Sequence, residues 1–405
     1  MRRPPPMGRT EFIALIAMMF ATIAFSMDAM LPALPEIGRE LSPDAPNRAQ
    51  LILTSFVLGI GLGTLFTGPV SDAFGRKRVI ICGAAVYIVA SAVAWASTSL
   101  EVVLAARVVQ GLGAAFPRIV SLAIVRDLYS GREMARTVSI AMMIFTIFPA
   151  FAPLMGEGII ALTGWRGIFL AFVLFSIISV GWMTLRLPES LPVERRRPFR
   201  PALLRAAIVE ILSHPLVRLS IVVQALCMGT LFSLLSMVQP VYDIVFDKAD
   251  SFTVWFAGVA LFSGTASLLN AALVVRVGMR AMVTWSLGIQ IILTGCMIIS
   301  LAVGMPEDLA FLLFVGWQAT LFFMAGTTLG NLNALAMEPM GHIAGMAASV
   351  ISSISTVSAA AIAAPIGLTF NGSLWPLALG IFVLCIIAFV IMLIMGRKEA
   401  AALAA

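Results

Sequence analysis

The amino-acid sequence predicts an all-α membrane protein in which twelve transmembrane helices form two bundles of six. Of the 405 residues, 60% are hydrophobic and only 11% are charged, whereas about a quarter of the residues in an average soluble domain are charged. The apolar residues lie in long uninterrupted runs of roughly the 20 residues that a helix needs to cross a bilayer. Because these runs lack the alternating pattern of a membrane-spanning strand, we expect helices and not a β-barrel.

Twelve such runs follow one another along the chain. The first six cover 11–34, 50–71, 79–98, 101–125, 136–160 and 166–186, and the last six cover 216–240, 253–275, 281–303, 309–333, 342–369 and 374–396. A polar and basic stretch separates the two sets and contains a short amphipathic segment at 202–212. We therefore expect an N-terminal bundle at 1–187, a cytoplasmic linker at 188–215 and a C-terminal bundle at 216–405. The first run is too long for the core of a secretory signal, so we interpret it as a membrane span.

Basic residues are distributed unequally between the two sides of this topology. If both termini are cytoplasmic, 20 of the 26 Lys and Arg residues lie on the cytoplasmic side and four on the opposite side. This asymmetry follows the positive-inside rule. The net charge of +6 is thus a sign of topology and gives no case for nucleic-acid binding. We expect a monomer in the inner (plasma) membrane of a bacterial cell, with the lipid bilayer as its surroundings.

Three charged side chains lie inside the apolar runs: Asp28, Arg107 and Arg118. A charge at membrane depth costs about 2.5–3.5 kcal/mol on insertion scales, so these residues are functional candidates. Arg107 and Arg118 are separated by about three helical turns and therefore lie on one face of a helix. We expect Asp28 to bind a proton and the two arginines to face a substrate cavity. The alternatives are a solvated cap at the mouth of the bundle for Asp28 and interhelical clamps on backbone carbonyls for the arginines.

The fifth run contains two prolines, Pro149 and Pro153, followed by Gly156. Each proline removes a hydrogen bond from the helical ladder, which favours a kink, and small residues allow a neighbouring helix to approach. Simple packing is the alternative interpretation. Methionine and phenylalanine side chains crowd the same run, and such adaptable surfaces suit varied apolar ligands. We therefore place Phe145 in the expected substrate cavity.

Between the second and third runs, the residues from Gly68 to Arg78 form a compact charged loop. Glycine and proline allow a tight reversal between helices, and the three consecutive cations at its end mark the cytoplasmic side. A weaker copy follows the eighth run, where Gly278 stands in the place of Gly75 but no acidic residue is present. The loop is therefore expected to act as a hinge between membrane helices.

Four motifs stand out: Gly68…Asp72…Gly75-Arg76-Lys-Arg78, Arg107-x-x-Gln110-Gly111, the segment from Asp28 to Pro35, and Arg126-Asp127. With them the chain resembles the major facilitator superfamily over nearly its whole length, and more narrowly its twelve-helix drug/proton antiporters of the Bcr/CflA type. The resemblance implies proton coupling by Asp28 and Arg107. It also implies a substrate cavity and a conformational latch. The resemblance places Asp72 and Arg76 in the latch, and we assign Gly68 and Gly75 to it as well. We expect the cavity to contain Asp28, Arg107, Gln110, Arg118 and Phe145.

The chain departs from the family pattern at four positions. Ala73 replaces a basic residue of the loop motif, so we expect a weaker latch. Phe148, Ala152 and Glu157 stand where the proline motif of antiporters prefers glycine, which bears on the direction of coupling.

The function expected from this resemblance is secondary transport by alternating access, with small amphipathic molecules such as drugs exported in exchange for protons. Small-molecule substrates and protons are then the partners, and no cofactor or metal is expected. One alternative is a proton-coupled importer or a uniporter. Another is an exporter of a specific anionic metabolite or siderophore-like solute. An integral-membrane enzyme is disfavoured because His214 and His342, the only histidines, have no ligand-like neighbours.

Overall fold

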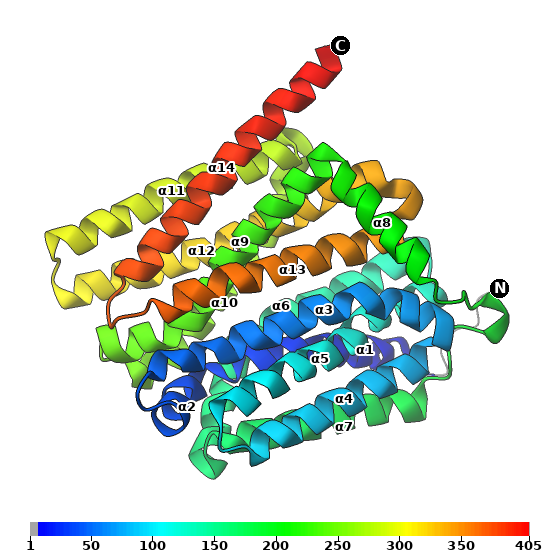
Figure 1. Ribbon diagram of the computed structural model, residues 1–405, viewed down its shortest axis with the longest axis horizontal. Helices are drawn as coiled ribbons and strands as arrows, with labels where there is room; N and C mark the ends of the chain where they lie inside the picture. Colours follow the sequence, from blue (N-terminus) through cyan, green and yellow to red (C-terminus); the bar gives the residue numbers. More distant parts are fainter. Residues whose placement is uncertain (1–6, 405) are drawn as a thin grey trace. The chain divides into compact units, whose positions relative to one another are not determined.

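The chain folds into α-helices, as the computed structural model describes for residues 7–404 (Figure 1). Eleven helical segments among these residues are long and apolar enough to cross a membrane. One of them, Glu307–Leu368, contains two long helices joined by the 3₁₀ turn Glu338–Ile343. The described part of the chain therefore has twelve helices of membrane-crossing length, which confirms the predicted all-helical fold. Arg2 and Arg3, which contribute to the predicted charge asymmetry, lie outside the described residues.

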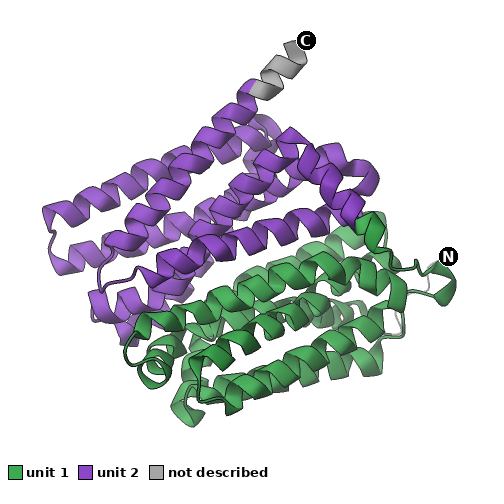
Figure 2. Ribbon diagram, in the orientation of Figure 1, with its two compact units in different colours: residues 1–204 green, residues 205–405 purple. Residues whose placement is uncertain are grey.

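The chain divides into two compact units, Met1–Leu204 and Arg205–Ala405 (Figure 2). The helices of the first unit are α1 (Arg9–Asp28), α2 (Leu34–Leu41), α3 (Leu51–Phe74), α4 (Arg76–Ala96), α5 (Leu100–Leu128), α6 (Gly131–Thr163) and α7 (Arg166–Arg186). Those of the second unit are α8 (Pro201–Ser213), α9 (Pro215–Pro240), α10 (Phe252–Val277), α11 (Met279–Val303), α12 (Glu307–Met337), α13 (Ala344–Leu368) and α14 (Trp375–Ala404). Helix α8 begins within the first unit's last residues and corresponds to the expected amphipathic segment.

The two units repeat one packing pattern. In the first unit, α5 packs against both α3 and α4, α4 packs against α7, and α1 packs against α6. In the second unit, α12 packs against α10 and α11, α11 packs against α14, and α9 packs against α13. Each of these pairs joins helices at the same positions in the order of six. The two halves are thus internal repeats in three dimensions, as in transporters built from two related bundles.

The turn between α3 and α4 is shorter than the sequence suggested. Helix α3 continues through Pro69 to Phe74, and α4 begins at Arg76. The expected loop from Gly68 to Arg78 is therefore wrong, because all of its residues except Gly75 are helical. Gly75 alone leaves the helical conformation, with φ of +97°, a region that glycine occupies at little cost. Gly278 makes the equivalent turn between α10 and α11 with φ of +88°.

Candidate functional site

Arg107 lies at the centre of a buried hydrogen-bond network in the first unit. Its side chain is completely buried on α5. Nε donates to the carbonyl of Ile52 (3.3 Å), Nη2 donates to the carbonyl of Ser26 (2.9 Å), and the guanidinium lies 4.2 Å from the centroid of the Phe56 ring. These partners come from α1 and α3. Arg107 therefore ties three helices together through backbone carbonyls and a cation–π contact.

The network continues through neutral polar side chains. The remaining nitrogen of Arg107, Nη1, donates to Gln110 Oε1 (2.6 Å), and Gln110 Nε2 donates to Ser91 Oγ (2.6 Å). Tyr87 OH shares a hydrogen bond of 2.6 Å with Ser26 Oγ, which brings α4 into contact with α1. All four partners are buried. Each polar group has a bonding partner, as groups inside a membrane protein require.

Asp28 is the last residue of α1, two positions after Ser26. It is only 6% exposed, and among the described residues its carboxyl group has no hydrogen bond or ion pair. The backbone beside it is held by α6, because a Cβ on Gly156 would collide with the carbonyl of Ala29. An unpaired charge is costly at this depth. Asp28 is thus a buried acidic side chain to which no described residue bonds.

Arg118 has different surroundings from Arg107, although both lie on α5. It is half-buried, and no described residue bonds to its guanidinium. Two contacts between α5 and α1 show which parts of these helices lie side by side. Ser121, one turn from Arg118, donates from Oγ to Met19 Sδ at 2.8 Å, whereas Arg107 donates to the carbonyl of Ser26. Since α1 and α5 run in opposite directions, Arg118 lies closer to the level of Met19 than to that of Asp28. Asp28 and Arg118 thus occupy different depths of the first unit.

The other residues expected in the cavity and the kink lie on α6. Phe145 packs edge-on against Phe20, with ring centroids 6.4 Å apart, beside the apolar core of the unit. Helix α6 runs without interruption through Pro149 and Pro153. Of these residues, Pro153 and Gly156 are buried and Phe145 is partly exposed. The structure therefore brings Gly156 against the backbone of Ala29, the residue after Asp28, and places the Phe145 ring beside that of Phe20.

The predicted latch is an ion-pair cluster around Arg76, whose side chain is almost entirely buried. Nη1 lies 2.6 Å from Asp72 Oδ1 and donates to Ser71 Oγ at 2.6 Å, and Nε donates to Asp127 Oδ2 at 3.1 Å. Asp127 closes α5, so the cluster joins the ends of α3, α4 and α5. Gly68 belongs to the same turn of α3, where its carbonyl accepts a hydrogen bond from Ser71.

Glu189 completes this cluster from the segment that the sequence assigned to a linker. Its Oε1 accepts the backbone N–H of Arg76 (2.9 Å), and its Oε2 accepts that of Lys77 (3.2 Å). Glu189 thus caps the N-terminus of α4, where a carboxylate is stabilised by unpaired N–H groups and by the helix dipole. The next residue, Ser190, donates to Asp127 Oδ2 (3.0 Å). Residues 189–190 therefore belong structurally to the first unit.

Sequence reasoning missed Glu189, Ser190, Tyr87, Ser26 and Ser91. The four residues other than Tyr87 are common polar types without a charge pattern, and Glu189 lies 113 positions from the backbone group that it caps. The dipeptide Glu189-Ser190 directly after Pro188 is the one signal available, since proline ends a helix and acidic and hydroxyl side chains serve as caps.

The fold resembles those of solved transporter structures. A crystal structure of a D-xylose–proton symporter matches with a TM-score of 0.73 at 13% identity, over 94% of this chain and 97% of the symporter. The human organic anion transporter MFSD10 matches with a TM-score of 0.62 at 17% identity, over 96% of this chain and all of that protein. At such low identity these likenesses establish the fold alone.

Sequence comparison finds bacterial relatives at higher identity. The bicyclomycin resistance protein homolog of Haemophilus influenzae is 29% identical over 349 residues, which is 85% of each chain. Multidrug resistance protein D of Escherichia coli K12 is 30% identical over 195 residues, covering 47% of this chain and 49% of that protein. The family model of the Major Facilitator Superfamily matches residues 14–365. With twelve long helices in two repeated units and this match, the chain belongs to the Major Facilitator Superfamily and is a multi-pass membrane transporter, not an enzyme.

Proposed function

We propose that this transporter works as a monomer in the bacterial plasma membrane, with both termini cytoplasmic, and exports small amphipathic molecules in exchange for protons. The observation that carries the proposal is Asp28, a buried carboxyl group at the end of α1 to which no described residue bonds. A proton on Asp28 removes the cost of its charge at this depth. Binding of substrate or a change in solvent access then shifts the balance between the two protonation states.

The surroundings of Asp28 support a coupling role. Gly156 lets α6 contact the backbone next to Asp28, and Arg107 holds the carbonyl two residues before it. Movement of α6 or α5 is therefore transmitted to the position of the carboxyl group. The names of the relatives, which are resistance proteins for bicyclomycin or several drugs, favour export of drug-like molecules.

Proteoliposomes with an imposed pH gradient test this proposal. Bicyclomycin and chloramphenicol are suitable first substrates, because one relative is named for resistance to bicyclomycin and another for resistance to chloramphenicol. Under antiport, substrate accumulates inside vesicles whose lumen is acidic, since protons leave as substrate enters. Accumulation in vesicles with an alkaline lumen would instead establish symport, and uptake that ignores the gradient would establish a uniporter.

A second candidate substrate class is an anionic solute, and Arg118 favours it. Its guanidinium is half-buried on α5 and has no partner among the described residues, so a carboxylate or phosphate on a solute would supply the missing acceptor. Arg118→Ala is then expected to reduce transport of anionic substrates at least ten-fold more than transport of cationic ones. Equal losses for both classes in the same vesicles would show that Arg118 has a structural role.

A further inference from the structure

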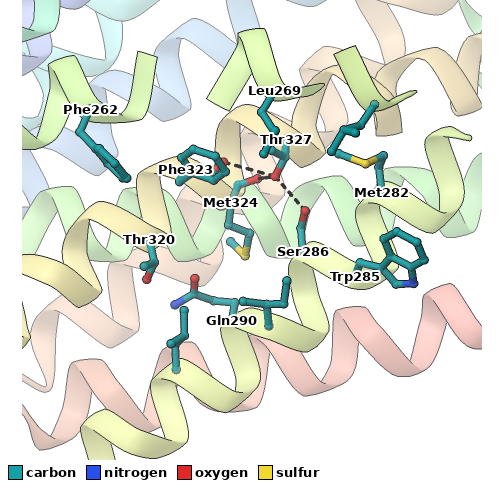
Figure 3. Close-up of a pocket in the computed structure, with 13 residues that line it drawn as sticks. Phe262, Leu269, Met282, Trp285, Ser286, Gln290, Thr320, Phe323, Met324 and Thr327 are labelled. Atoms are coloured by element: carbon teal, nitrogen blue, oxygen red, sulfur yellow. Dashed lines mark hydrogen bonds between the residues drawn. The ribbon is translucent and has the colours of Figure 1, made fainter. Parts of the chain in front are cut away.

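The second unit has an apolar groove between α10, α11 and α12 (Figure 3). Its volume is about 300 Å³, at the lower end of the range for small-molecule sites. Phe262 on α10 and Trp285 and Ile289 on α11 line the groove and are each more than half exposed. All three helices belong to membrane-crossing segments. The groove therefore opens to the hydrocarbon of the bilayer.

The walls of the groove are aromatic and apolar, and none of the 13 lining residues drawn in Figure 3 is charged. Phe262, Trp285 and Phe323 supply rings, and Met282 and Met324 supply thioethers. Methionine side chains adapt to ligands of different shape, and sulfur packs favourably against aromatic rings. A charged ligand would find no counter-charge among these residues. The walls therefore suit an uncharged aromatic molecule.

Gln290 on α11 adds a polar group to this apolar lining. Its side chain is only 2% exposed. Nε2 donates to Thr294 Oγ1 at 3.3 Å, and no described residue donates to Oε1. Figure 3 shows the amide group extending toward Thr320 on α12, which also lines the groove. A carbonyl oxygen without a donor is costly in apolar surroundings, so a ligand that donates to Oε1 is stabilised in this groove.

The hydroxyl groups of the groove differ from Gln290, because they are bonded within the protein. Ser286 and Thr327 share a hydrogen bond of 2.9 Å, drawn in Figure 3. Thr320 Oγ1 donates to the carbonyl of Trp317 at 2.7 Å. Gln290 Oε1 is therefore the acceptor that a donor on a ligand would satisfy.

The first unit contains an equivalent set of polar residues. Ser91 on α4 and Thr294 on α11 both lie sixteen residues after the positive-φ glycine that precedes their helix. Each hydroxyl oxygen accepts a hydrogen bond from the helix that follows: Ser91 from Gln110 Nε2 at 2.6 Å, and Thr294 from Trp317 Nε1 at 3.0 Å. The two units thus repeat this hydrogen bond as well as the helix packing.

The residue one turn earlier is bonded differently in the two units. Tyr87 and Gln290 both lie twelve residues after the same glycines, and both are buried. Tyr87 OH shares a hydrogen bond of 2.6 Å with Ser26 on α1. Gln290 instead turns its N–H group to Thr294 on its own helix. A contact that the first unit makes within the protein is therefore left open to a ligand in the second.

We propose that this groove binds an uncharged aromatic molecule with a hydrogen-bond donor, a hydroxyl or amide N–H group that bonds to Gln290 Oε1. The molecule enters from the bilayer, and its rings lie against Trp285 and Phe323. The site uses none of the residues of the Arg107 network. It does not depend on the direction of transport or on proton coupling.

Tryptophan quenching in phosphatidylcholine nanodiscs tests the role of Gln290 in the full-length transporter. The probes are nitrobiphenylmethanol, whose hydroxyl group donates, and its methyl ether, which cannot donate; the nitro group of both quenches tryptophan fluorescence. After correction for partitioning into protein-free nanodiscs, the alcohol is expected to bind about five-fold more tightly than the ether, the effect of one neutral hydrogen bond. Gln290→Leu is expected to remove this difference, because leucine has a similar volume but no acceptor.

Gln239→Leu is the matched control for this experiment. Gln239 is a buried residue of α9 whose Oε1 is bonded to no described residue, and it does not line the groove. This variant is expected to keep the preference for the alcohol. Equal binding of the two probes by the unaltered transporter would show that the groove holds any apolar molecule, lipid chains included, and would overturn the proposal. Loss of the preference in both variants would overturn it as well.

A second pair of variants tests the location of the site. Thr320→Phe places a ring beside Gln290 and is expected to weaken binding of both probes at least about five-fold, because the groove is then overfilled. Thr265→Phe adds the same ring at an exposed position of α10 that does not line the groove, and it is expected to leave both affinities unchanged. Thermal unfolding of the two variants separates a blocked groove from a loss of folding. Unchanged affinities in Thr320→Phe would show that the probes bind elsewhere and would refute the site.

Discussion

Arg107 and Arg118 lie on one helix, but their guanidinium groups have different surroundings. Arg107 uses its guanidinium to bind Ile52, Ser26 and Gln110, whereas no described residue bonds to Arg118. A planar guanidinium suits the surroundings of Arg107 because it donates in three directions at fixed angles. The solute-binding role that we propose for Arg118 needs only a charge that is open to a ligand.

Arg107→Lys is expected to lower the thermal stability of the purified transporter. A lysine keeps the charge but cannot reach three acceptors at once, and each buried acceptor left without a donor costs about 1–3 kcal/mol. Arg118→Lys serves as the control on the same helix and is expected to change the melting temperature little. A comparable loss in both variants, measured by thermal unfolding in detergent, would contradict the clamp assigned to Arg107.

Asp28→Asn is expected to abolish proton-driven transport while substrate binding is largely retained. Asparagine has nearly the same shape as aspartic acid but carries no titratable proton, so only the coupling is removed. Glu36→Gln, an exposed position on the neighbouring helix α2, is the control. Vesicle uptake and equilibrium binding measure the two properties separately. Full antiport by Asp28→Asn would exclude this carboxyl group as the proton carrier.

The helices of the first unit contact one another through small residues at defined places. A Cβ on Gly156 would meet the backbone of Ala29, and a Cβ on Gly111 would meet that of Phe56. Such close backbone approach is common between membrane helices. The positions of α1, α3, α5 and α6 therefore depend on residues without side chains.

Gly156→Ala is expected to destabilise the transporter by about 1–3 kcal/mol, because the added methyl group forces α6 away from α1. Transport is expected to fall as well, since the same shift moves the backbone beside Asp28. Gly158→Ala, two residues further along α6, meets no atom within 4 Å and is the matched control. If both variants keep their melting temperature and transport activity, the contact between α6 and Ala29 contributes neither to stability nor to transport.

Glu189→Gln is expected to destabilise the first turn of α4 by about 0.5–2 kcal/mol, the usual range for the loss of a helix cap. The amide can accept one N–H but lacks the negative charge that the helix N-terminus stabilises. Hydrogen exchange at Arg76 and Lys77 would report the change directly. Glu194→Gln, an exposed position in the same segment, should leave this exchange unaffected; equal acceleration in both variants would argue against the cap.

The architecture of the whole chain could be predicted from the sequence, because each helix is an apolar run of bilayer length and the charges mark its ends. The ends of the helices are harder to predict. The first run was expected to reach residue 34 but α1 stops at Asp28, and the second was expected to end at residue 71 but α3 continues to Phe74. Hydrophobicity alone does not decide between helix and loop at these ends. The cap by Glu189 and the hydrogen bonds of Tyr87 were not predictable. They join residues far apart in sequence, and nothing in their local pattern reports the partner.

Labelling with an impermeant maleimide tests the proposed orientation of the chain. In a background without native cysteines, Asp250→Cys is expected to react in intact cells and Arg200→Cys only after the membrane is opened. Both positions are exposed in the structure. The 20 basic residues assigned to the cytoplasmic side are the physical reason for this expectation. The reverse labelling pattern would place the termini outside.

The two positive-φ glycines, Gly75 and Gly278, suggest how an internally duplicated protein diverges. A charged residue can be replaced by a single mutation whose cost is one ion pair, and Val275 stands in the second turn where Asp72 stands in the first. A glycine at positive φ has no substitute that keeps the chain path, so its replacement affects every helix that follows. In these two turns the backbone geometry is therefore the same while the side-chain chemistry differs. The turn at Gly278 thus shares the chain path of the turn at Gly75 although the side chains around the two glycines differ.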